Sequence, residues 1–321
     1  MVSFRIALFA LVAACLAAQP PAGEVFRART GLVVVPVTVT GAKSAFADGL
    51  EAADFRLLDN GRSQPVEVET ADALSSPISI VVLVQTNDLA RPALAKIQKI
   101  GSMIQPLITG ERGRAAVAGF GSKVDLLSEF TDDAGQIGDA FARLKESRDS
   151  TARMRDAVDA AVGMLAGRPA RDRKAILIIG ETRDRGSEIA LADVVQAVQR
   201  SGITVYAATF SVYKTAFTAK NHEQAQAGGM NLLAAFRELG RLGSLNDVEA
   251  LTEGTGGERA SFATLRSLEA RISRLGEELH AQYQLTYRTP PEPGYHRIVV
   301  SVEGRPELKV RARPGYWVEE P

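Results

Sequence analysis

The chain has 321 residues, of which 45% are hydrophobic and 24% charged, a composition that excludes a disordered chain and a multi-span membrane protein. Lys and Arg number 38 and Asp and Glu number 38, so the formal net charge is zero and no overall field attracts nucleic acid. This length fits one large α/β domain with additional structure, or two domains.

The first residues have the pattern of an export signal. Arg5 precedes an apolar run over residues 6–18, which is too short to span a bilayer and ends in small residues. We expect residues 1–18 to be removed and the protein to be exported, either periplasmic or secreted. The alternative is a lipoprotein anchored to the membrane through Cys15. Cys15 is the single cysteine, so the sequence excludes disulfides, a Cys-based zinc site and thiol catalysis.

The region after the signal is rich in β-forming residues. Residues 32–40 (LVVVPVTVT) are mostly β-branched, and Pro36 within them favours an edge strand. The Asn60-Gly61 pair predicts a hairpin turn between residues 55–58 and the alternating residues 66–69.

The middle of the chain alternates strand and helix patterns. Residues 78–84 (ISIVVLV) and 175–179 (AILII) are continuous apolar runs, typical of strands buried on both faces. Such alternation predicts an α/β fold with a doubly wound, mostly parallel sheet, whose ligands bind at the carboxyl ends of the strands. Further strands are predicted at 115–120, 124–127 and 203–210, and helices at 94–107, 137–144, 154–165, 189–198, 232–242, 248–251 and 265–280. Residues 211–226 are a long polar connection to which the sequence assigns no role.

The chain also ends in β structure, with strands predicted at 282–287, 297–302 and 308–313. Neither β end has enough strands to bury a core alone, so we expect the two ends to pack together as a small sandwich. The predicted organisation is a signal peptide (1–18), an N-terminal β region (25–72), an α/β domain (76–280) and a C-terminal β region (281–318).

The order of these segments resembles the von Willebrand factor type A (VWA) family, and more narrowly a bacterial exported subfamily of VWA-related proteins. The resemblance covers nearly the whole chain after the signal, and it implies a VWA fold and a role in protein–protein interaction or adhesion. It rests on residues 32–40, Leu50, Asp54-Phe55, the Asn60-Gly61 turn, residues 153–157 (RMRDA), 251–257 (LTEGTGG), 282–287 (QYQLTY) and 311–316 (RARPGY).

VWA domains usually hold a divalent ion in a metal-ion-dependent adhesion site, and this sequence departs from that motif. The family pattern Asp-x-Ser-x-Ser is replaced by Gln85, Asn87 and Leu89. Thr151 matches the later Thr with imperfect spacing, and Glu181 stands at the position of the later Asp. The resemblance therefore implies a degenerate site.

Ligand chemistry supports this interpretation. Mg²⁺ requires octahedral oxygen ligands with at least one anion, whereas Leu89 offers no oxygen and Gln85 offers a neutral amide. Arg183 and Arg185 repel a cation near Glu181. We therefore expect no metal and no cofactor, with a divergent Mg²⁺ or Ca²⁺ site as the alternative.

The loops at the strand ends remain suited to gripping a protein, because side chains on loops are held there by a rigid sheet. Amides and hydroxyls supply donors and acceptors, and the mixed charges from residue 181 to 185 can pair with charges on a partner. The predicted partner-binding residues are Gln85, Thr86, Asn87, Asp88, Thr151, Glu181, Thr182, Arg183 and Asp184. The partner is an unidentified protein, with no nucleic acid, and with a membrane only if Cys15 is lipidated.

Enzyme motifs are missing from the sequence. His222, His280 and His296 lie far apart and lack zinc-ligand spacing, and no Gly-x-Ser-x-Gly elbow or phosphate loop occurs. The glycine-rich residues 254–257 follow a helix and favour a tight turn. We predict that the protein is not an enzyme, with a hydrolase of unknown substrate as the alternative.

Overall fold

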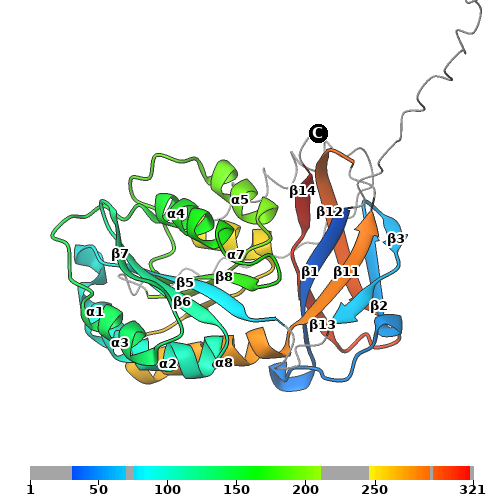
Figure 1. The fold of residues 1–321 in the computed structure, drawn as a ribbon, viewed down its shortest axis with the longest axis horizontal. Coiled ribbons are helices and arrows are strands. Elements are labelled where there is room, and N and C mark those ends of the chain that lie inside the picture. The colour runs from blue at the N-terminus through cyan, green and yellow to red at the C-terminus, as the bar shows by residue number, and fades with distance from the viewer. Residues whose placement is uncertain (1–30, 70–75, 211–245, 290–291, 319–321) are drawn as a thin grey trace, which may run out of the picture.

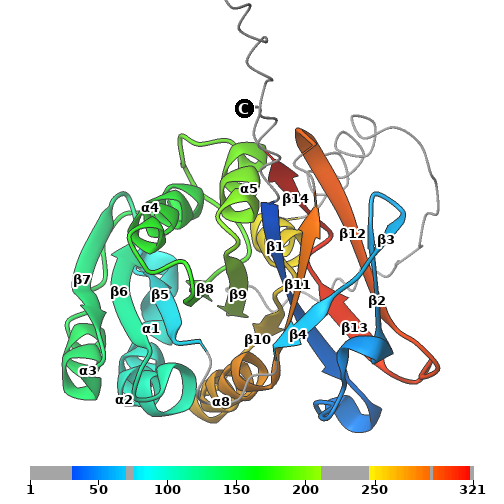
Figure 2. The same cartoon turned by 45° about the vertical axis from the view of Figure 1, so that its right-hand side comes forward.

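The computed structural model describes residues 31–69, 76–210, 246–289 and 292–318. The predicted signal segment 1–18, the polar connection 211–226 and the predicted helix 232–242 lie outside these residues. An α/β domain and a β-sandwich lie side by side, with β1 of the sandwich facing the α/β domain (Figures 1 and 2). Within the described ranges, no helix combines the length and the apolar character needed to cross a membrane.

The central sheet of the α/β domain runs in the order β10-β9-β8-β5-β6-β7. The neighbouring strands pair in parallel, except that β7 runs antiparallel to β6 at one edge. β5 lies in the middle and is buried along its whole length, as its continuous apolar run predicts. The predicted doubly wound sheet is confirmed. Its strands are β5 (Ile78–Gln85), β6 (Arg114–Phe120), β7 (Val124–Thr131), β8 (Arg173–Gly180), β9 (Thr204–Thr209) and β10 (Arg259–Ser261).

Helices cover both faces of this sheet, because successive side chains of its strands point to opposite sides. Ile80 and Val82 pack into one core, whereas Val81 and Leu83 pack into the other. The first core lies under α1 (Arg91–Ile97), α2 (Gly101–Ile104), α3 (Ala134–Ala142) and α8 (Leu265–Ala281). The second lies under α4 (Met154–Ala166), α5 (Leu191–Arg200) and α7 (Asp247–Thr255).

The two β ends of the chain form the sandwich together, as expected. One sheet has the order β13-β1-β11-β4 and the other β14-β12-β2-β3, so each combines early and late strands. Val35, Leu57 and Leu285 are fully buried between them. The strands are β1 (Gly31–Thr40), β2 (Phe55–Asp59), β3 (Arg62–Gln64), β4 (Glu67–Glu69), β11 (Tyr283–Thr289), β12 (Gly294–Val302), β13 (Lys309–Ala312) and β14 (Gly315–Val318).

The predicted hairpin forms at its turn but with a different second strand. Asn60 and Gly61 both have positive φ, as a tight hairpin turn requires, and β2 pairs with β3. The prediction that residues 66–69 complete this hairpin is wrong, because β4 pairs with β11 in the opposite sheet. Pro65 between β3 and β4 has no amide donor, which explains why the strand is interrupted there.

The edge-strand prediction for residues 32–40 holds for half of β1. β11 pairs with β1 from Gly31 to Val37, whereas β13 pairs only with residues 37–40. Among the described strands, none pairs with the other edge of the first half of β1. Pro36 lies in that half, where its missing N–H costs no ladder hydrogen bond.

A buried ion pair lies between two neighbouring strands of one sheet of the sandwich. The Nδ1 of His296 on β12 lies 2.9 Å from the Oδ1 of Asp59 on β2. The hydroxyls of Tyr287 and Tyr316 donate to the Oδ2 of Asp59 at 2.8 and 3.0 Å. Burial alone would raise the pKa of Asp59, but the bonds from His296 and Tyr287 lower it overall. Burial would likewise lower the pKa of His296, and the bond to Asp59 raises it instead.

Candidate functional site

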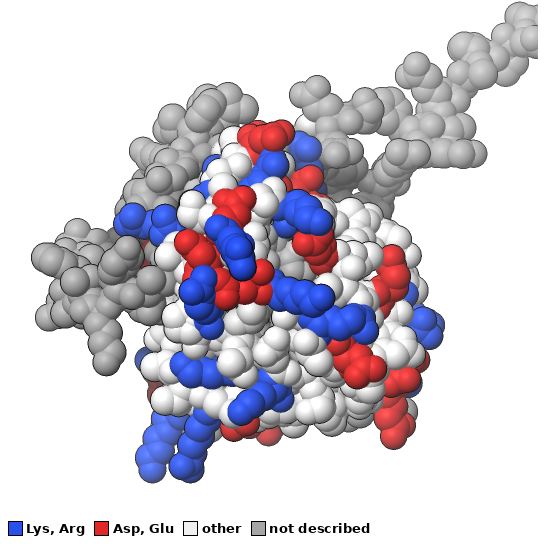
Figure 3. Space-filling view, turned by 90° about the vertical axis from the view of Figure 1, so that its left-hand side faces the viewer, with Lys and Arg blue, Asp and Glu red and all other residues white. Residues whose placement is uncertain are grey.

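The predicted site lies at the carboxyl ends of β5 and β8, where a loop follows each strand and the connection between α3 and α4 lies beside them. We call these loops the rim. They comprise residues 85–88, 147–153 and 181–187. Figure 3 shows this side of the α/β domain, where basic and acidic side chains lie interleaved across the centre of the face. The rim therefore has no single charge sign.

Gln85, the last residue of β5, links two rim loops. Its Nε2 donates to the Oδ1 of Asn87 at 2.8 Å and to the Oε2 of Glu181 at 3.0 Å, while its Oε1 accepts from the backbone N of Glu181 at 2.7 Å. Gly180 makes room for this side chain, because a Cβ there would lie 2.8 Å from the Oε1 of Gln85. Gln85 is fully buried, so its role is to position Glu181.

Arg185 neutralises Glu181 from the same loop. Its Nε and Nη2 donate to the two carboxylate oxygens of Glu181 at 3.2 and 3.3 Å. The side chain of Glu181 is 11% exposed and that of Arg185 is 40% exposed. The carboxylate of Glu181 is thus bonded both to the amide of Gln85 and to the guanidinium of Arg185.

The loop before α4 is fastened to the loop after β8. Ala152 and Arg185 form a two-bond bridge, in which each backbone N donates to the other residue's carbonyl at 2.9 and 2.8 Å. The Nδ2 of Asn87 donates to the carbonyl of Ser150 at 3.2 Å. These bonds hold the rim loops in one arrangement.

Further backbone contacts fix Thr86, Asp88 and Thr151. The hydroxyl of Thr86 donates to the carbonyl of Phe120 at 3.2 Å, and the N of Asp88 donates to the carbonyl of Asp149 at 3.2 Å. The N of Thr151 donates to the carboxylate of Asp149 at 2.8 Å, and this bond holds the pKa of Asp149 below its usual value. These residues therefore shape the loops.

Asp184 organises the start of α4. Its Oδ1 accepts from the N of Arg155 at 3.0 Å, and its Oδ2 accepts from the Nη2 of Arg155 and the N of Ser187, both at 3.0 Å. Burial alone would raise the pKa of Asp184, but the bonds from Ser187 and Arg155 lower it overall. A carboxylate bound by amides in the first turn of a helix acts as a cap, so Asp184 has a structural role.

The structure thus brings most of the predicted residues together, but many of their side chains are buried or half-buried. Partner contact by these nine residues stays a prediction. The carboxylates of Glu181 and Asp184 are paired with arginines of the same chain. Gln85, Thr86, Asn87 and Glu181 are buried, Asp88, Thr151, Thr182 and Asp184 are half-buried, and Arg183 is exposed.

Sequence reasoning missed Arg155 as a member of the rim network. It lies in the RMRDA string, yet its partner Asp184 is 29 residues away, and no local spacing indicates the pair. Arg185 was expected to repel a cation, and the structure adds that it binds Glu181 directly.

Most oxygen donors at the rim are engaged within the chain, although the Oδ1 of Asp88 and the Oγ1 of Thr151 are buried without a hydrogen-bond partner. The Gln85 Oε1 and Asn87 Oδ1 oxygens already accept hydrogen bonds, and the Glu181 carboxylate is paired with Arg185. Among the residues that the structure describes, no group of three or more His, Cys, Asp or Glu side chains is placed to hold a metal.

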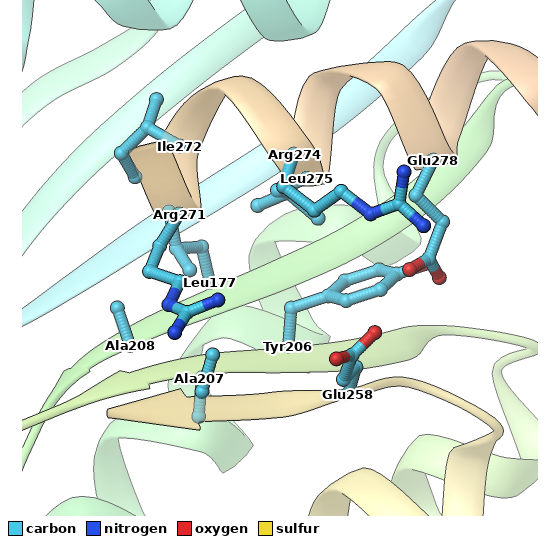
Figure 4. Close-up of a pocket in the computed structure, with 11 residues that line it drawn as sticks. Leu177, Tyr206, Ala207, Ala208, Glu258, Arg271, Ile272, Arg274, Leu275 and Glu278 are labelled. Carbon is cyan, nitrogen blue, oxygen red and sulfur yellow. The ribbon is translucent and has the colours of Figure 1, made fainter. Parts of the chain in front are cut away.

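A small pocket beside α8 does not resemble a catalytic centre. Its volume is about 40 Å³, far below that of a substrate pocket. Figure 4 shows Tyr206 and Glu278 pointing toward each other between β9 and α8. Glu278 also accepts from Thr38 of the sandwich at 3.1 Å and pairs with Arg311 at 2.6 Å. Burial raises the pKa of Tyr206 well above its usual value. These groups connect the α/β domain to the sandwich.

Comparison with known proteins yields structural likeness at low sequence identity. No family model matches the sequence, and no curated protein matches it. A von Willebrand factor type A protein from Catenulispora acidiphila is 11% identical with a TM-score of 0.46, over 92% of this chain and 76% of that one. The vWF domain of the type V pili tip protein Mfa5 from Porphyromonas gingivalis is 11% identical with a TM-score of 0.44, over 64% and 95%.

Proximal thread matrix protein 1 from the mussel byssus is 10% identical with a TM-score of 0.47, over 70% of this chain and 50% of that one, so the match spans half of the mussel protein. Identities and scores this low carry no argument about binding. The fold class of this chain rests on its own sheet order.

Proposed function

We propose that this chain is an exported VWA-type binding module whose rim grips a protein partner without a metal ion. The observation that carries the proposal is the state of Glu181. Its carboxylate, the acidic group at the position where the resemblance places a metal ligand, is bound by Arg185 at 3.2 and 3.3 Å and by Gln85 at 3.0 Å.

A divalent ion would have to break this arrangement. It would displace the guanidinium of Arg185 and turn the amide of Gln85, which are already bonded, and Mg²⁺ also gives up its own water reluctantly. The guanidinium of Arg185 supplies the positive charge that a metal ion would otherwise supply beside Glu181. Its five fixed donors also suit the recognition of a carboxylate.

Arg183 is the rim residue best placed to meet a partner. It is exposed, and in the described part of the chain no ion pair or hydrogen bond of its side chain is found. An exposed guanidinium on a fixed loop can form a bidentate pair with a carboxylate of another protein. Hydrogen bonds join the loops beneath it, and such preorganisation lowers the ordering cost of association.

Thermal unfolding in chelator and then in millimolar Mg²⁺, Mn²⁺ or Ca²⁺ tests the absence of a metal. An ion at about 100 times its dissociation constant would add about 2.7 kcal/mol and raise the Tm by a few degrees. We expect no shift. A shift that disappears in both Glu181→Ala and Glu181→Gln would overturn metal independence and leave a cation-dependent adhesion module.

Partner capture in chelator tests the rim itself. Immobilised protein should retain the same extracellular or periplasmic protein from its source organism in EDTA and in Mg²⁺. Arg183→Glu should abolish this retention. Arg56→Glu, an exposed reversal on β2 of the sandwich, is the matched control and should retain it. Equal retention by both variants would place the binding surface elsewhere.

A further inference from the structure

A groove separates the amino ends of the central strands from the sandwich, at the opposite end of the sheet from the rim. Its volume is about 920 Å³, in the range of ligand sites. One wall contains the starts of β8 and β9, and the other contains the first half of β1, which faces them (Figure 2). Trp317 of β14 spans the groove's end, donating its Nε1 to the Oε1 of Gln199 at 3.0 Å. This bond fixes the distance between the walls.

Positive charge is concentrated in this groove, although the whole chain is neutral. Among the described lining residues, the cations outnumber the carboxylates. Asp172 is already engaged, because its Oδ2 accepts from Ser79 at 2.7 Å and from Arg168 at 3.4 Å. The cations are Arg171, Arg173, Lys174, Arg200 and Arg313, and the carboxylates are Glu69 and Asp172.

Two of these guanidiniums are packed into the walls. Arg313 is 8% exposed, and its Nη2 donates to the carbonyl of Val34 at 2.7 Å. Arg173 donates its Nη1 to the carbonyl of Leu279 at 2.8 Å. The Nε of each is buried without a hydrogen-bond partner, and within the described ranges neither side chain forms an ion pair.

Burial of these charges costs free energy that an anion would recover. Desolvation lowers the pKa of both Arg173 and Arg313, which means that the protein around them disfavours the charged form. A carboxylate in the groove would reverse this effect by supplying the negative charge that favours the charged form of both guanidiniums.

The wall formed by the first half of β1 carries two exposed apolar side chains. Leu32 and Val34 are 61% and 40% exposed, and no described strand other than β11 pairs with this half of β1. They alternate with the buried Val33 and Val35, so their side chains point away from the sandwich core. In the groove these apolar side chains face the cations at the start of β8, whereas Arg313 lies on the same side as β1.

We propose that this groove binds an extended acidic segment of a partner protein in which carboxylate and apolar side chains alternate. An extended chain sends successive side chains to opposite faces, so one face meets Leu32 and Val34 while the other meets the cations at the start of β8. The unpaired half of β1 is six residues long, which corresponds to about 20 Å of extended chain. Recognition is through side chains, since Pro36 has no N–H and Arg313 occupies the carbonyl of Val34.

Fluorescence anisotropy with a labelled eight-residue peptide of alternating Glu and Val tests this proposal on the full chain. We expect saturable binding that weakens with added salt. The double variant Arg171→Glu with Lys174→Glu should weaken binding at least tenfold, and Leu32→Ser with Val34→Ser should weaken it severalfold. Lys99→Glu with Lys145→Glu, a matched reversal of exposed lysines elsewhere on the α/β domain, should leave binding unchanged.

Two comparison probes separate the alternatives. A peptide of the same composition with its Glu and Val in two blocks should bind more weakly than the alternating peptide. If both peptides bind equally and inorganic tripolyphosphate displaces them regardless of Leu32 and Val34, the groove is a simple anion site and the peptide proposal fails. Absence of binding also overturns it. Arg183→Glu at the rim should not change binding, so this result is independent of the proposed function.

Discussion

The two ends of the central sheet differ in how their charged side chains are paired. At the carboxyl end, Glu181 is paired with Arg185 and Asp184 with Arg155, each within hydrogen-bond distance. At the amino end, Arg173 and Arg313 are packed into a groove in which neither forms an ion pair with a described residue, although Glu69 attracts Arg173 from a greater distance.

This difference separates charges that are paired within the chain from charges that, in our groove proposal, pair with a ligand. Removing one member of an internal pair leaves its partner uncompensated, so it should cost stability. Removing a charge that has no partner should not lower the free energy of unfolding. It should weaken only the binding of a ligand. The substitutions below are ranked by the expected loss of the free energy of unfolding. They lie at the two ends of the sheet and at the buried pair in the sandwich.

The largest effect is expected in the sandwich, where Asp59 and His296 are both buried. Asp59→Asn should lower the free energy of unfolding by about 3–5 kcal/mol, the usual cost of breaking a buried pair by removing one partner. Urea denaturation at pH 6 measures this loss. Asp125→Asn on β7, an exposed carboxylate 54% accessible, is the control and should change stability by less than about 0.5 kcal/mol.

The same pair should make stability depend on pH. The pKa of His296 is raised in the fold, so its contribution is complete below the unfolded value of 6.5 and is lost as pH rises through the folded value. The pKa of Asp59 is lowered, so its contribution is present above 3.8 and is lost as pH falls through the folded value. Stability from the pair should peak between these limits. An unchanged pH profile in Asp59→Asn would contradict this account.

Much of the fold follows from local sequence patterns. The continuous apolar run of β5 predicts a central strand, and the Asn60-Gly61 pair predicts its turn, because both signals act on neighbouring residues. The pairing of β4 with β11 was not predictable in this way. It joins residues more than 200 positions apart, and the short β4 carries no register signal of its own.

The position of the rim could be predicted from sequence, but the contacts of its side chains could not. Strand ends predict where Gln85 and Glu181 lie, since parallel strands finish at the same edge of a sheet. Their chemistry depends on whether a side chain points inward or outward. Gln85 is buried and serves Glu181, whereas Arg183 is exposed, and the mixed charge run from residue 181 to 185 looks the same in either case.

A moderate effect is expected at the rim. Arg185→Met should lower the free energy of unfolding by about 1 kcal/mol, because the pair with Glu181 is partly exposed and solvent screens it. The same variant should gain affinity for Mg²⁺, since the carboxylate then lacks its cation. Chemical denaturation with and without Mg²⁺ measures both changes. Unchanged stability would show that the pair contributes nothing.

The smallest effect on the free energy of unfolding is expected in the groove, where a cationic residue is again replaced by Met. Lys174→Met removes a half-buried cation next to Arg171 and Arg173, and should leave the free energy of unfolding within about 0.5 kcal/mol or raise it slightly, because like charges repel there. Added salt should stabilise the wild type more than this variant, since salt screens a repulsion that the variant lacks. A loss as large as that of Arg185→Met would mean that Lys174 has a partner within the chain, and the contrast between the two ends of the sheet would then disappear.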